Sequence, residues 1–111
     1  MREFHHIGVP TTKQRPNEAF LEPAKLYVTP ADADPMQIEW LRFLPGSPMP
    51  KELQTQTHLA FKVDDMDAEL KGKQVLIPPF EPMPGVKVAF VLHEGVPVEF
   101  MQLTAAGGKA Y

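Results

Sequence analysis

The stretch HLAFKVDDMDAELKG, residues 58–72, is the most informative about the fold, because it predicts a strand followed directly by a short helix. Apolar residues alternate over His58–Val63, which predicts a β-strand. The acidic run DDMD that follows is typical of a helix N-terminus, where side-chain carboxylates cap free backbone N–H groups. Met66 and Leu70 share one face of that helix, and Gly72 ends it. We therefore expect this helix to pack against the strand that precedes it.

The residues after this helix predict three more strands. They cover Gln74–Ile77, which Pro78 and Pro79 end, then Val86–Leu92 and Val96–Leu103. Glycine in the connection His93–Gly95 favours a hairpin between the last two strands. The second half of the chain is thus predicted to run strand, helix, strand, strand, strand.

The first half has weaker signals because prolines interrupt it. Strands are predicted at Phe4–Val9, Lys25–Thr29 and Met36–Leu44, with at most a short helix near Asn17–Leu21. The proline-rich segment 45–57 is predicted to be a linker. Proline accounts for 13 of the 111 residues, which leaves little room for long helices.

Composition narrows the class of protein. The chain has no cysteine, which excludes a disulfide scaffold, thiolate metal sites and a cysteine nucleophile. The net charge is -3 and Lys and Arg do not cluster, so we expect neither nucleic acid nor a membrane as a partner. With neither a long apolar run nor a signal-peptide core, the sequence predicts a soluble, cytoplasmic protein.

The two halves contain similar motifs in the same order. HIGV at 6–9 parallels HLAF at 58–61, and IEWL at 38–41 parallels VEFM at 98–101. Each half begins with a histidine strand and closes with a glutamate strand. This order indicates an internal duplication.

Strand alternation places the four polar residues of these motifs on one face. His6, Glu39, His58 and Glu99 all lie opposite the apolar side chains expected to form the core. A buried carboxylate needs a partner, and a divalent metal would be one. Two imidazoles and two carboxylates suit zinc, nickel, cobalt, manganese or iron. The sequence therefore predicts one divalent metal ion bound by these four residues.

A purely structural explanation is also open. In that case Arg42, Lys62 or Lys87 would have to neutralise the two carboxylates. Taken singly, each histidine or glutamate is also consistent with an ordinary strand residue. Regular alternation turns His5 away from His6, and Trp40 is expected in the core. His93 is expected to be exposed at its turn.

The motifs resemble those of the vicinal oxygen chelate superfamily, which includes glyoxalases, bleomycin-resistance proteins and dioxygenases. They are HIGVPT from His6, QIEWLRF from Gln37, HLAFKVDDMDAEL from His58 and VAFVLHEGVPVEFMQ from Val88. The resemblance implies an α+β fold in which two βαβββ modules form a cupped mixed sheet around a metal. Position by position, the family's ligands fall on His6, Glu39, His58 and Glu99.

The first module is shorter than the family pattern. We expect its helix to be short or missing and one strand to be lost. Residues 1–111 would then form a single domain, with module one at about 4–44, the linker at 45–57, module two at 58–103 and a tail at 104–111. The resemblance also implies a homodimer.

The function implied is that of a metal-dependent isomerase, epimerase or lyase. The substrate would be a small oxygen-chelating molecule, such as a 2-oxo or 2-hydroxy acyl compound, and the metal would stabilise an enediolate. Glu99 or Glu39 would be the catalytic base, and the resemblance favours Glu99. Two alternatives stay open, which are a non-catalytic binding module of the same fold and an iron-dependent oxygenase.

Overall fold

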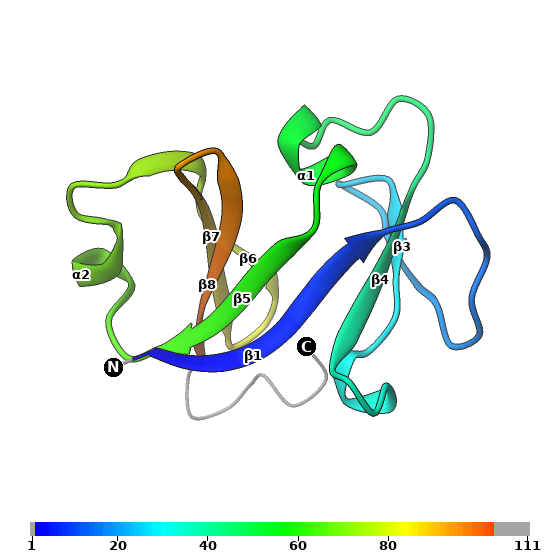
Figure 1. The fold of residues 1–111 in the computed structure, drawn as a ribbon, viewed down its shortest axis with the longest axis horizontal. Coiled ribbons are helices and arrows are strands. Elements are labelled where there is room, and N and C mark those ends of the chain that lie inside the picture. Colours follow the sequence, from blue (N-terminus) through cyan, green and yellow to red (C-terminus); the bar gives the residue numbers. More distant parts are fainter. Residues whose placement is uncertain (1, 104–111) are drawn as a thin grey trace.

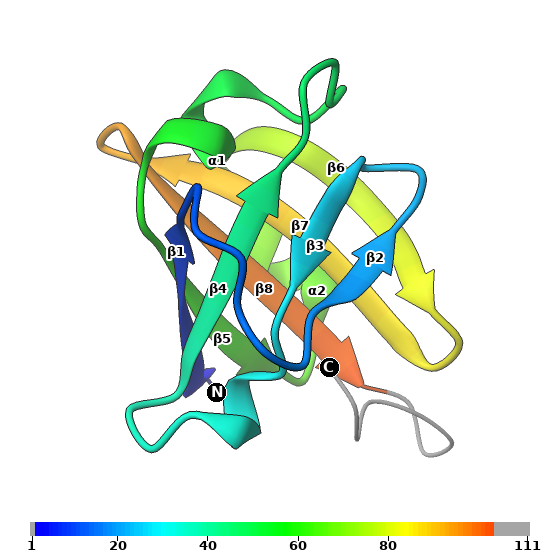
Figure 2. The same ribbon diagram turned by 90° about the vertical axis from the view of Figure 1, so that its right-hand side faces the viewer.

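The computed structural model describes residues 2–103, which form one curled sheet of eight strands (Figures 1 and 2). The predicted tail lies outside these residues. The strands are β1 (Arg2–Pro10), β2 (Ala19–Leu21), β3 (Leu26–Val28), β4 (Ile38–Phe43), β5 (His58–Val63), β6 (Gln74–Met83), β7 (Val86–His93) and β8 (Val96–Leu103). The helices are η1 (Ala31–Ala33), α1 (Lys51–Thr55) and α2 (Met66–Leu70). No helix in this part of the chain is long and apolar enough to cross a membrane.

The strand order is β2-β3-β4-β1-β5-β8-β7-β6, which is two copies of one four-stranded pattern. In each copy the first strand pairs in parallel with the fourth, β1 with β4 and β5 with β8. The copies join through the antiparallel pair β1 and β5. Parallel and antiparallel pairs therefore occur in one cupped sheet, which confirms the predicted fold class.

The first module keeps all four strands, so the expectation that one strand was lost is wrong. β2 and β3 contain three residues each and pair as a short hairpin. No helix forms between β1 and β2, as expected for a missing first helix. Asn17 has a positive φ of 66°, so it starts a turn into β2 and not the short helix considered for this region.

Segment 45–57 contains a helix that the sequence did not predict. α1 begins after Pro50 and buries Leu53, which is 2% exposed. Leu53 packs against Ala60 and Met101 on the concave face of the sheet. Because this helix is a little over one turn long, its apolar periodicity is too short to be recognised in the sequence.

β6 extends past the prolines that were expected to end it. The strand continues through Pro78, Pro79 and Pro82, and its pairing with β7 shifts register three times. β6 is an edge strand, so residues that lack an N–H can face away from β7. Proline is therefore tolerated here, where a central strand would lose a hydrogen bond.

α2 forms as predicted and covers the convex face. The Asp65 carboxylate accepts a hydrogen bond from the Ala68 N–H at 3.2 Å and caps the helix. Met66 is fully buried against Val63 and Phe100. α2 thus covers the convex face of the second module and leaves the concave face of the sheet free to form a site.

Candidate metal centre

The four predicted residues lie on the four central strands of the sheet. β4 carries Glu39, β1 carries His6, β5 carries His58 and β8 carries Glu99. Each is buried, with exposed fractions between 0% and 5%. One ligand atom from each residue lies within 4.8 Å of those of the other three. The structure thus brings together all four residues that the sequence selected.

Small residues between the four side chains make this convergence possible. In strand register, Gly8 lies between Glu39 and His58. On the adjacent rung, Ala60 lies between His6 and Glu99. Larger side chains at these two positions would separate the four residues. The ligand types therefore alternate with small residues across the concave face.

Gly8 is required by the position of the His58 imidazole. A Cβ atom built on Gly8 would overlap the His58 ring. Gly8 has no positive φ, so space and not backbone conformation explains the glycine. Sequence reasoning did not assign Gly8 a role, although the HIG motif contains the signal.

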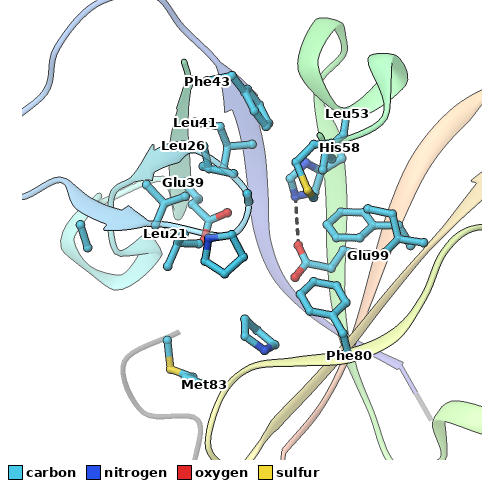
Figure 3. A pocket seen from close by; sticks show the side chains of 18 of the residues that line it. Leu21, Leu26, Glu39, Leu41, Phe43, Leu53, His58, Phe80, Met83 and Glu99 are labelled. Carbon is cyan, nitrogen blue, oxygen red and sulfur yellow. Dashed lines mark hydrogen bonds and ion pairs between the residues drawn. The ribbon is translucent and has the colours of Figure 1, made fainter. Parts of the chain in front are cut away.

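The Glu99 carboxylate lies between the two imidazoles, and the Glu39 carboxylate lies beside His6. Glu99 Oε1 is 3.0 Å from His58 Nε2 and 3.3 Å from His6 Nε2. His6 Nε2 is in turn 3.4 Å from Glu39 Oε1. Figure 3 shows Glu39, His58 and Glu99 pointing toward one another from opposite sides of the cup.

Burial and the interactions within the cluster shift the pKa values of three of the four residues. Burial alone would lower the pKa of His6, but its interactions with Glu39 and Glu99 outweigh burial and raise it to about 10. Burial raises the pKa of Glu39. Burial opposes ionisation of Glu99, yet the imidazoles of His58 and His6 hold its pKa well below the usual range. This raised pKa favours a protonated His6 imidazole between the two glutamates when no metal is bound.

The donor set fits a divalent transition metal. Neutral imidazole nitrogen and carboxylate oxygen are the ligands that zinc, nickel, cobalt, manganese and iron accept together. Two of the three cations proposed as structural partners are engaged elsewhere. The Arg42 guanidinium forms a bidentate ion pair with the Glu18 carboxylate, with N–O distances of 2.7 and 2.8 Å. Lys62 Nζ lies 3.7 Å from Glu3 Oε1.

Two predictions about neighbouring aromatic residues are wrong. A β-bulge between Phe4 and His6 breaks the alternation of β1, and His5 Nδ1 lies 2.8 Å from His6 Nδ1. The Gln37 side chain holds this bulge by donating a hydrogen bond to the His5 carbonyl at 2.8 Å.

Trp40 is half-buried under the Arg15 guanidinium and is not a core residue. His93 is exposed, as expected.

His5 therefore lies beside the site, a position that the sequence analysis did not predict. Burial, and then the charge of His6, lower the pKa of His5. A neutral His5 ring can accept a hydrogen bond from the Nδ1–H of His6, which leaves His6 Nε2 directed at the carboxylates. A strand bulge has no reliable signature in a single sequence.

The cluster opens into a cavity of about 490 Å³, within the range of small-molecule sites. Glu39, His58 and Glu99 line its inner end. Its other walls come from β2, β3, β4, β6, β7, α1 and the segments around them. Apolar residues dominate these walls, and they include Leu21, Leu26, Leu41, Phe43, Leu53, Ile77, Phe80, Met83 and Phe90 (Figure 3).

The cupped sheet built from two related modules is the vicinal oxygen chelate fold. A methylmalonyl-CoA epimerase from Mycobacterium tuberculosis has a similar structure, with a TM-score of 0.67 and 16% identity over 94% of this chain and 89% of that one. A hypothetical protein from Bacillus halodurans C-125 gives a TM-score of 0.66 and 17% identity, over 97% of this chain and 99% of that one. No family model and no curated protein matches the sequence. At these identities the likeness establishes the fold alone.

Proposed function

We propose that the protein is a metal-dependent isomerase, epimerase or lyase acting on a small oxygen-chelating acyl substrate. The observation that carries this proposal is the cluster of His6, Glu39, His58 and Glu99 at the inner end of a cavity. These residues would hold one divalent metal ion. When bound, the metal would supply Lewis-acid stabilisation of negative charge that develops on substrate oxygens.

A carboxylate at the site would move the proton. Glu39 and Glu99 both line the cavity, so either would face a substrate bound there. We assign the base to Glu99, because the resemblance to the superfamily favours the glutamate of the last strand. The proton would pass from the substrate carbon to the carboxylate and then return to the substrate.

Exchange of the substrate's α-hydrogen for solvent deuterium tests this role. Metal-loaded wild-type protein should catalyse the exchange on one or more members of a panel of 2-oxo and 2-hydroxy acyl compounds, followed by NMR. Glu99→Gln should lower the rate by about 100-fold or more, as expected for loss of a general base. Glu94→Gln, in the exposed turn before β8, is the matched control and should leave the rate unchanged. Unchanged exchange in both Glu39→Gln and Glu99→Gln would overturn the proposal.

The apolar walls favour a second candidate, a binding module without turnover. Leu41, Phe43 and Phe90 could hold a small hydrophobic molecule whether or not a metal is present. This candidate predicts that a His6→Ala, His58→Ala double variant still binds the ligand. If this double variant loses both the metal and ligand binding, the result would favour the metal-dependent enzyme.

We also propose that the protein is cytoplasmic, as its sequence predicts, and that it forms a homodimer, as the resemblance implies. β2 and β6 are the edges of the sheet and have unpaired backbone groups on one side, which gives a physical reason for association. Sedimentation equilibrium of the purified chain tests the assembly. A mass of one chain at micromolar concentration would contradict it.

A further inference from the structure

We infer that the substrate has an apolar, uncharged body and carries charge only on the oxygen atoms that reach the metal site. This inference rests on the proposed function and adds the class of substrate to it. It comes from the distribution of polar groups along the cavity, which are concentrated at one end.

Only four of the described residues that line the cavity are polar. Three of them, Glu39, His58 and Glu99, belong to the candidate metal centre. The fourth, Thr29, already accepts a hydrogen bond from the Trp40 N–H at 2.9 Å. Beyond the centre, the described walls therefore present few groups that can hydrogen-bond to a ligand.

The direction of β4 shows where the body of the substrate would lie. Leu41 and Phe43 follow Glu39 on the same face of this strand, so the wall turns apolar immediately beyond the carboxylate. Phe80 and Met83 on β6 form another part of the wall (Figure 3). A ligand whose oxygens reach the metal site would thus place its remaining atoms between these apolar surfaces.

The metal site has no excess positive charge that could stabilise an anionic group on the body of the substrate. Two glutamates balance the charge of one divalent metal, and the residues described as lining the cavity include no Lys or Arg. Arg42 belongs to β4 but is engaged by Glu18. A carboxylate or phosphate on the body of the substrate would lose its hydration without gaining a partner, which is unfavourable.

Two chelators that differ in one group test the inference. Pentanohydroxamate and the monohydroxamate of glutarate share the same metal-binding head and chain length, but one ends in a methyl group and the other in a carboxylate. Calorimetric titration of the cobalt-loaded protein should give at least tenfold tighter binding of pentanohydroxamate. The short chain keeps the terminal group near the metal end of the cavity.

A charge added to the wall should reduce this preference. Phe80 lines the cavity yet is 38% exposed, so Phe80→Arg can be tolerated by the fold and should bring the two affinities at least threefold closer. Phe20→Arg is the matched control, because Phe20 is 44% exposed on the other edge strand and does not line the cavity. It should keep the wild-type preference.

The outcomes separate this inference from the proposed function. Equal or tighter binding of the carboxylated chelator to the cobalt-loaded wild type would overturn the apolar substrate class and leave the metal site standing. An unchanged preference in Phe80→Arg, with cobalt still bound, would also overturn it. Failure of the wild type to take up cobalt, which its absorption spectrum would show, would overturn the proposed function and this inference with it.

Discussion

The imidazole of His58 occupies the space that a side chain on Gly8 would need. The two residues are directly paired across β1 and β5. This close approach lets His58 reach Glu99, and Gly8 is also paired with Glu39 on the other side. The glycine is therefore part of the candidate metal centre even though it has no ligand atom.

Gly8→Ala should remove metal binding and lower stability together. The new methyl group overlaps the His58 ring, and overpacking of this kind costs about 1–3 kcal/mol. Urea unfolding should show this loss in the metal-free protein. Elemental analysis of the same sample should show much less than one metal ion per chain.

Gly72→Ala provides the control for this variant. Gly72 lies after α2 with φ 75° and has no atom within 4 Å of the place an added methyl group would take, so alanine there adds backbone strain but touches no ligand. It should lower stability by about 1–2 kcal/mol and keep full metal content. Equal metal content in Gly8→Ala and Gly72→Ala would contradict the role assigned to Gly8.

His5 should tune the affinity for the metal without being a ligand. Its Nδ1 lies 2.8 Å from His6 Nδ1, and a hydrogen bond donated by the His6 Nδ1–H would orient His6 Nε2 toward Glu39 and Glu99. Loss of such a supporting hydrogen bond typically weakens metal binding by about 10- to 100-fold. Competition with a metal-sensitive dye should detect this change in His5→Ala. The exposed His93→Ala should bind metal like the wild type, and an unchanged affinity in both variants would refute this role.

Stability of the metal-free protein should fall as the pH rises above neutrality. The pKa of His6 is about 10 in the folded chain and about 6.5 in an unfolded one. The stabilisation by its proton is complete below about pH 6.5 and is lost as the pH rises through 10. The free energy of unfolding should therefore decrease by about 1.4 kcal/mol per pH unit between pH 7 and 9.

Metal should abolish this pH dependence by replacing the proton on His6. Binding near pH 7 should release about one proton per metal ion, because the ligand must be neutral. Calorimetry in buffers of different ionisation enthalpy measures this number. A flat stability profile in metal-free protein, or metal binding without proton release, would show that His6 is not protonated between Glu39 and Glu99.

Much of the second module was predictable because its sequence signals agree with one another. The strand His58–Val63, the Asp65 cap and the hairpin after β7 all follow from local pattern and form as expected. The four candidate ligands were also found, since alternation and the repeated order depend only on regular strands. β1 stays in the right register at His6 despite its bulge.

The structural features that the sequence did not predict depend on tertiary context. β2 is too short to produce a pattern, and it forms because β3, which lies within the predicted strand Lys25–Thr29, supplies a partner. β6 keeps its prolines because it lies at an edge, which only the complete sheet defines. The contact between His5 and His6 depends on a bulge, and regular alternation predicts the opposite orientation. These differences follow from pairing between distant segments, which a single sequence does not display.

The metal content of the purified chain, without a histidine tag, tests the central claim most directly. The account predicts about one transition-metal ion per wild-type chain and loss of that ion in a His58→Ala, Glu99→Ala double variant. Zinc, nickel, cobalt or manganese would agree with the isomerase, epimerase or lyase, whereas iron with oxygen uptake would favour the oxygenase. Wild-type protein that binds none of these ions, even after incubation with each, would contradict the account.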